Sequence, residues 1–142
     1  MILAFLLFSL LVAVTVMIHY EMLRILSINI PKLPIRHRLR VVIGVFGTIC
    51  AHLIEVSLFG LAIFLLLGLG DFGSLQGNFN GSLIDCVYFS FTTYTTIGYG
   101  DIEPVGAIRF LAGLEAITGL SMITWSASFM FMEMTKFWED EK

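Results

Sequence analysis

Residues 95–101 read Thr95-Thr96-Ile97-Gly98-Tyr99-Gly100-Asp101, and the rest of the chain is organised around this stretch. Successive backbone carbonyls point the same way only where left-handed and right-handed residues alternate, and glycine adopts the left-handed conformation at little cost. Gly98 and Gly100 are spaced for such an alternation. The stretch therefore predicts a ladder of carbonyl oxygens that replaces the water around a dehydrated cation. One chain supplies one wall of such a ladder, so we expect four copies to meet.

The composition indicates that the chain lies in a membrane. Of its 142 residues, 58% are hydrophobic and 13% are charged, whereas soluble domains are about 45–50% apolar. The net charge of −3 and the lack of an extended basic patch with interleaved aromatic residues argue against nucleic-acid binding. No nucleophile, base and orienting group cluster in the sequence, so we do not expect an enzyme.

Three apolar segments are long enough to cross a bilayer, and they cover residues 1–20, 41–68 and 107–134. The first is expected to be a retained helix rather than a signal peptide, because no Lys or Arg precedes its apolar run and no small-x-small cleavage site follows it. Residues 82–95 are too short to span, so they are predicted to form a re-entrant pore helix buried in protein. Residues 71–82 are polar and rich in glycine, which indicates an outer loop. The expected fold class is an all-α membrane protein.

The segment of residues 21–40 is predicted to be a basic linker at the cytoplasmic surface. It holds five of the eight Lys and Arg residues of the chain, which are Arg24, Lys32, Arg36, Arg38 and Arg40. Basic loops remain in the cytoplasm, so the amino terminus is expected outside and residues 135–142 are expected to form a cytoplasmic tail. Two roles for the linker stay open. It either binds anionic lipid through Arg36, Arg38 and Arg40 or acts as a gating lever.

The hexapeptide of residues 96–101 follows the aromatic and threonine-rich run of residues 88–95 and precedes Pro104 and Arg109. With these neighbours it resembles the pore domain of the potassium channel family, in its small bacterial form, over roughly residues 41–134. The resemblance implies a two-transmembrane pore unit with one additional amino-terminal helix, assembled as a homotetramer. The expected potassium ligands are Thr96, Ile97, Gly98, Tyr99 and Gly100, with K⁺ held by the backbone carbonyls of Thr96, Ile97, Gly98 and Tyr99.

The function that the resemblance implies is passive, potassium-selective conduction across the cell (inner) membrane, with K⁺ as the permeant ligand and no cofactor. Two alternatives stay open. The chain is either a pore subunit of a potassium uptake transporter system or a non-conducting regulatory membrane subunit. Uptake systems of this lineage typically fuse four degenerate pore units in one chain, whereas this chain has one unit with an intact motif.

Support for the filter is expected from the pore helix and from the last apolar segment. Aromatic packing and threonine hydroxyls are predicted to hold its width, although some family members carry a carboxylate at the position of Thr92. Glu115 is expected to brace the pore helix through a Thr or Ser hydroxyl, and tuning the electric field in the cavity is its alternative role. The full set of predicted supporting residues is Asp101, Thr92, Thr93, Thr95, Tyr94 and Glu115. By the resemblance, Gly119 falls at the gating hinge of the inner helix, and close helix packing is its alternative role.

His52 and Glu55 lie near the centre of the second apolar segment and share one helix face. Ionisable groups at this depth are expensive and are functional candidates by default. Two roles stay open for the pair, a proton-sensing gate and a hydrogen-bonded strut between helices. Two residues do not make a zinc site, and the pattern His-Glu-x-x-His is absent.

Overall fold

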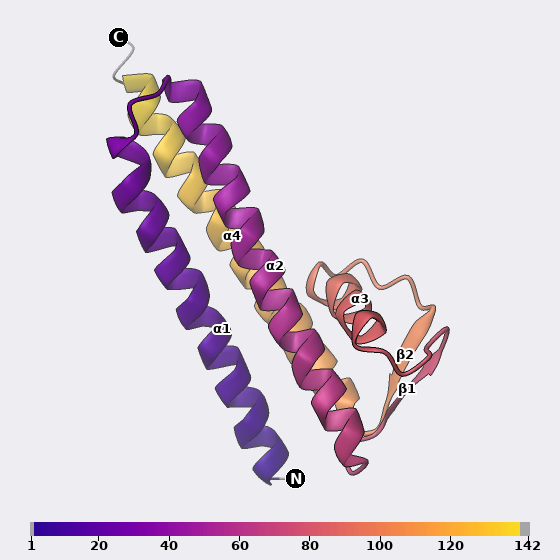
Figure 1. Ribbon diagram of the computed structural model, residues 1–142. Coiled ribbons are helices and arrows are strands. Elements are labelled where there is room, and N and C mark those ends of the chain that lie inside the picture. The colour runs from indigo at the N-terminus through magenta and orange to yellow at the C-terminus, as the bar shows by residue number, and fades with distance from the viewer. Residues whose placement is uncertain (1, 140–142) are drawn as a thin grey trace.

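The computed structural model describes the backbone of residues 2–139 and the side chains of residues 5–136. Three long helices lie side by side, and a short helix with a two-stranded ribbon is packed at one end of them (Figure 1). The elements are α1 (Ile2–Asn29), the 3₁₀ turn η1 (Ile30–Lys32), α2 (His37–Leu69), β1 (Ser74–Gly77), α3 (Leu83–Tyr94), β2 (Ile102–Val105) and α4 (Ile108–Glu139). The predicted all-α membrane fold is confirmed, with one small β-ribbon added to it.

Three helices are long and apolar enough to cross a membrane, over Phe5–Lys32, His37–Leu69 and Ile108–Lys136. The 33 residues of α2 span about 50 Å at 1.5 Å per residue, which exceeds the roughly 30 Å hydrocarbon core of a bilayer. The helices therefore tilt or project beyond the lipid. Large apolar side chains such as Phe46 and Leu65 are exposed along them, which suits contact with lipid or with further chains.

Helices α1 and α4 both extend beyond the boundaries expected from the sequence. Helix α1 continues to Asn29, so residues 21–29 of the expected linker are helical, and the break falls at Pro31 in η1. Proline removes a backbone donor and ends a helix, whereas the polar residues before it do not. At the other end α4 continues to Glu139, so the first part of the expected tail is helical, and residues 140–142 lie outside the described part of the chain.

The loop after α2 forms a strand instead of an irregular turn. Strand β1 pairs antiparallel with β2, which directly follows the filter, and Gly77 is the partner of Ile102. Gly77 has φ +98°, and a Cβ atom there would lie 2.2 Å from the carbonyl oxygen of Asp101. The ribbon thus fixes the outer end of the filter segment to the end of α2.

Helix α1 packs against α2 and α4 of its own chain. Phe8 stacks on Phe110 of α4 with ring centroids 6.5 Å apart. Closer to the other end, a Cβ atom at Gly47 of α2 would lie 2.4 Å from Leu26 of α1, so glycine lets these two helices approach closely. The additional helix is therefore an integral part of the bundle rather than a loosely attached anchor.

Helix α3 lies between α2 and α4 and touches both through glycine. A Cβ atom at Gly60 of α2 would lie 2.7 Å from the Cα atom of Val87, and one at Gly119 of α4 would lie 2.1 Å from the carbonyl oxygen of Tyr94. Both obstacles are backbone atoms, which cannot turn aside. The close approach to Tyr94 accounts for glycine at position 119 without any bending, and the hinge role of Gly119 stays a prediction.

We expect Gly119→Ala to destabilise the protein by about 1–3 kcal/mol, the usual cost of overpacking, because the new methyl group collides with the backbone of Tyr94. Gly113→Ala in the same helix is the matched control. No atom lies within 4 Å of a Cβ atom built at Gly113, and alanine favours a helix by about 1 kcal/mol over glycine. Thermal unfolding of the two purified variants measures the difference. Equal stability of both variants would show that the contact with Tyr94 does not require glycine.

Candidate functional site: the pore loop and the polar network behind it

The backbone of the pore loop alternates in handedness. Thr96, Gly98 and Gly100 have φ angles of +58°, +53° and +77°, and the described residues between them have negative φ. Alternate left-handed residues turn successive carbonyls to one side of the chain, which is the geometry that a carbonyl ladder needs. The two glycines were expected from the sequence. Thr96 was not, because a β-branched residue rarely adopts a positive φ.

The pore loop is held by carbonyl groups at the end of α3. The amide of Gly98 donates to the carbonyl of Thr92 at 3.0 Å, and the amide of Thr96 donates to the carbonyl of Thr93 at 2.9 Å. The hydroxyls of Thr92 and Thr95 instead donate to carbonyls of their own helix, at Phe89 and Phe91. Thr92 and Thr93 therefore contact the loop through their backbone, whereas the sequence suggested their hydroxyls.

The start of α3 is fixed by hydrogen bonds to the side chains of Ser82 and Asp85. The hydroxyl of Ser82 accepts a hydrogen bond from the amide of Asp85 at 3.1 Å, and the carboxylate of Asp85 accepts one from the amide of Asn80 at 2.9 Å. Ser82 thus caps the amino terminus of the helix, and Asp85 fixes the chain two residues before the cap. The opposite end of α3, with its partial negative charge, meets the pore loop at Thr95.

The outer end of the pore loop is tied to α3 by a second contact. The hydroxyl of Tyr88 donates to the carboxylate of Asp101 at 2.9 Å. The hydrogen bond to Asp101 raises the pKa of Tyr88, so the phenol remains a donor at neutral pH. Asp101 was expected to support the filter, and Tyr88 is its partner on the helix.

Glu115 lies fully buried on α4 and contacts the middle of α3. The hydroxyl of Ser90 lies within hydrogen-bonding distance of Glu115 Oε1 and of the carbonyl oxygen of Val56, the latter at 3.0 Å. Ser90 therefore joins three helices at one point. The contact matches the expected bracing of the pore helix through a serine, and the effect of the brace on the filter stays a prediction.

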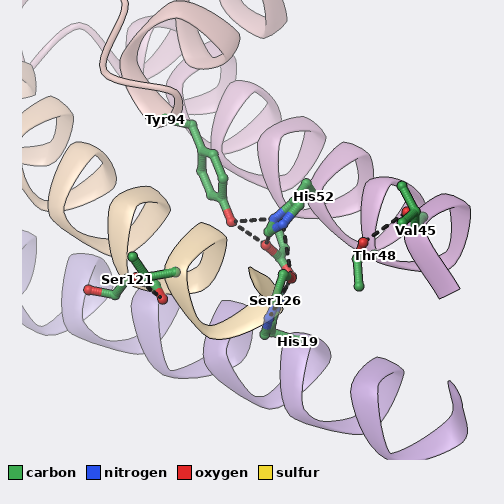
Figure 2. Close-up of polar contacts among 9 residues, drawn as sticks. His19, Val45, Thr48, His52, Tyr94, Ser121 and Ser126 are labelled. Atoms are coloured by element: carbon green, nitrogen blue, oxygen red, sulfur yellow. Dashed lines mark hydrogen bonds and ion pairs between the residues drawn. The ribbon is translucent and has the colours of Figure 1, made fainter. Parts of the chain in front are cut away.

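Behind the foot of α3, five polar side chains from four helices form a buried network (Figure 2). Glu55 lies at its centre, with Oε1 at 2.8 Å from Nδ1 of His19 and Oε2 at 3.2 Å from Nδ1 of His52. Tyr94 donates to the same Oε2 atom. Ser126 of α4 lies 3.3 Å from Nε2 of His19 and 3.1 Å from Nε2 of His52. His19 and Glu55 have no exposed surface.

Tyr94 connects this network to the pore loop. It is the last residue of α3, and Thr95 and Thr96 follow it directly. Its side chain is 1% exposed, and burial together with the hydrogen bond to Glu55 raises its pKa, which keeps the phenol protonated as a donor. The position of the helix end thus depends on Glu55, and through Glu55 on His19 of α1.

The sequence indicated part of this network and missed the rest. His52 and Glu55 were expected to share a helix face, and they do. His19 and Ser126 were not expected, because they lie on other helices and no local pattern connects them to Glu55. A polar residue at the inner end of an apolar helix was the one available signal for His19. The proton-sensing role of His52 and Glu55 stays a prediction.

The family comparison agrees with this arrangement. Residues 42–136 match the model of a family described as an ion channel. The matched range contains most of α2, all of α3 and the pore loop, and nearly all of α4, whereas α1 lies outside it. This family is not an enzyme family, and with its three apolar helices the chain is a multi-pass membrane protein.

Three known proteins are similar to part of this chain. An uncharacterized protein of Methanothermus fervidus is 38% identical over 82 residues, which are 54% of this chain and 13% of that protein. The inward rectifier potassium channel Kirbac3.1 of Paramagnetospirillum magnetotacticum is 34% identical over 86 residues, 60% of this chain and 28% of that protein. The potassium channel protein kcv of Paramecium bursaria Chlorella virus 1 is 39% identical over 56 residues, 34% of this chain and 60% of that protein.

The chain thus spans less than two thirds of the length of each of these relatives. No solved structure matches it significantly. The matched segment nevertheless covers most of the chain and includes the whole pore loop with both helices that hold it. On this match, the chain belongs to the ion channel family.

Proposed function

We propose that the chain forms a homotetrameric, potassium-selective channel that conducts K⁺ passively. The observation that carries the proposal is the left-handed backbone at Thr96, Gly98 and Gly100, which turns the intervening carbonyls to one side. Rings of such carbonyls replace the hydration shell of K⁺ in selectivity filters. The ions are bound by carbonyls of the predicted potassium ligands, residues 96–100. Two relatives with potassium channel names support the choice of ion.

Assembly from four copies follows from what one chain leaves exposed. All five residues of the pore loop from Thr96 to Gly100 are exposed, and the side chain of Tyr99 is 70% exposed. A hollow of about 400 Å³ lies beside the loop, bordered by α3, the loop and α4. An exposed tyrosine next to an unfilled hollow suits packing between neighbouring copies, and four carbonyl walls complete the ladder.

The orientation in the membrane follows from the distribution of basic residues. Arg36 and Arg38 are exposed at the start of α2, and Lys136 is exposed near the end of α4. These positions lie at the end of the bundle opposite to the pore loop (Figure 1). Because basic segments remain in the cytoplasm, the pore loop faces outward, the amino terminus lies outside and the carboxyl terminus lies in the cytoplasm. Arg36, Arg38 and Arg40 are placed to contact anionic lipid headgroups.

Flux through purified protein in liposomes tests the channel proposal. We expect K⁺ and Tl⁺ to pass, Na⁺ to be excluded and Ba²⁺ to block, because rings of backbone carbonyls replace the hydration shell of K⁺ in potassium-selective filters. Equal fluxes of K⁺ and Na⁺ would contradict potassium selectivity. The mass of the detergent-solubilised complex separates the channel from a subunit of an uptake system, because the channel requires four identical chains.

We expect Gly98→Ala to abolish potassium flux. A residue with a Cβ atom costs roughly 1–2 kcal/mol in the left-handed conformation. Alanine at position 98 would impose this cost on the pore loop of every copy. Gly81→Ala is the matched control, because Gly81 also has a positive φ, of +82°, with no atom within 4 Å of an added Cβ atom. Gly81 lies in the outer loop before α3, so this variant should keep its flux. Conduction by Gly98→Ala at the level of the control would contradict the assignment of the filter.

We also propose that Ser90 and Glu115 brace the filter through α3. Ser90→Ala removes a hydroxyl from a buried carboxylate, and an unsatisfied buried polar group costs about 1–3 kcal/mol. We expect lower thermal stability of the tetramer and a loss of K⁺ over Na⁺ preference in the flux assay. Ser57→Ala is the control, since its exposed hydroxyl only donates to Leu53 of the same helix. A variant Ser90→Ala with unchanged selectivity would reduce the pair to a packing contact.

A further inference from the structure

From the network around Glu55 we infer a binding site for one transition-metal ion, best fitted by Zn²⁺, with His19, His52 and Glu55 as its ligands. Each of the three residues offers a ligand atom, and these atoms lie within 4.8 Å of one another. Two imidazoles and one carboxylate are a donor set that zinc uses, often with a fourth position left open. Calcium and magnesium prefer oxygen ligands alone, so the two nitrogen donors favour zinc.

The distances between the donor atoms suit the size of the ion. Ligands at 2.0–2.1 Å from a tetrahedral zinc ion are about 3.3 Å apart. Oε1 of Glu55 lies 2.8 Å from Nδ1 of His19, Oε2 lies 3.2 Å from Nδ1 of His52, and the three ligand atoms of the group lie within 4.8 Å of one another. No pair of donors therefore needs to move by more than about 1.5 Å to reach a tetrahedral geometry. The hydroxyl of Tyr94 lies 3.1 Å from Nδ1 of His52, next to these donor atoms.

With both imidazole rings neutral, the network is one hydrogen-bond donor short, which a protonated histidine or a bound cation can supply. Both Nδ1 atoms face oxygen acceptors and so carry a proton, which leaves Nε2 of each neutral ring as an acceptor. Both Nε2 atoms face the hydroxyl of Ser126, which has a single proton to donate. One buried nitrogen is therefore left without a donor. The carboxylate of Glu55 is buried among these groups, and a bound cation would also neutralise it.

A metal ion removes this deficit. When an ion replaces both Nδ1 protons, each neutral ring carries its proton on Nε2, and the oxygen of Ser126 can accept from both rings. Metal-bound histidines commonly donate their second N–H group to such a partner, which fixes the ring orientation. Ser126 and Tyr94 thus take the place of the outer hydrogen-bonding partners of a metal site.

The site combines the additional helix with the pore domain. His19 comes from α1, outside the range that matches the ion channel family, whereas His52 and Glu55 come from α2 inside it. The side chain of His52 is 20% exposed, which leaves one side of the site open to an entering ion. Bound zinc would join α1 to α2 beside Tyr94, the residue that precedes the pore loop.

Metal bound to the full chain tests the inference directly. Protein in lipid nanodiscs is first treated with a chelator, then equilibrated with Zn²⁺, and its bound metal is measured by mass spectrometry. We expect one zinc ion per chain in the wild type. His19→Ala and Glu55→Gln should each lower the affinity by at least tenfold, because even outer partners of metal ligands contribute about 10–100-fold. His37→Ala is the control, since this third histidine begins α2 away from the network.

A second variant keeps the test valid if the removal of a ligand impairs folding. His19→Cys retains a metal ligand, and a thiolate favours softer ions, so this variant should still bind and should shift its preference from Zn²⁺ towards Cd²⁺. The inference is overturned if the wild type binds no zinc beyond that of a His19→Ala variant that folds, or if His19→Cys leaves the metal preference unchanged. Because bound metal is measured without ion flux, these results do not depend on whether the chain conducts potassium.

Discussion

The left-handed backbone at Thr96 is the constraint on which the other contacts of the pore loop depend. Glycine adopts a positive φ at little cost, but a β-branched residue does not. The strain at Thr96 is offset by neighbouring hydrogen bonds, because its amide and that of Gly98 donate to carbonyls at the end of α3. The pore loop keeps its shape only while the end of α3 keeps its position.

The pore loop is fixed at its outer end, and α3 is held by contacts with α2 and α4. Gly60 and Gly119 bring α2 and α4 against its backbone, and Ser90 joins both helices at its middle. The β-ribbon and the bond between Tyr88 and Asp101 fix the outer end of the loop. Each of these contacts joins residues that are close in the folded structure but far apart in the sequence. The shape of the pore loop thus depends on contacts throughout the matched domain and not on its motif alone.

The sequence predicted what local pattern determines. The glycine spacing identified Gly98 and Gly100 as left-handed, and the apolar runs identified the three long helices. The sequence did not predict the features that depend on contacts between distant segments of the chain. The β-ribbon arises from residues on either side of the filter, and His19 meets Glu55 only because α1 packs on α2. No hydrophobic periodicity or motif within one segment indicates which distant segment it will contact.

The packing of α1 against α2 stabilises the buried carboxylate of Glu55, because it brings His19 within hydrogen-bonding distance. A carboxylate in an apolar bundle is costly unless its oxygens are paired and hydrogen-bonded. In the pore domain alone, His52 and Tyr94 serve only the Oε2 atom, whereas His19 supplies the partner of Oε1. Removal of α1 would therefore leave one oxygen of a buried carboxylate without a donor, next to Tyr94 at the end of α3. The additional helix and the filter are consequently parts of one structural unit, although only one of them lies within the family's matched range.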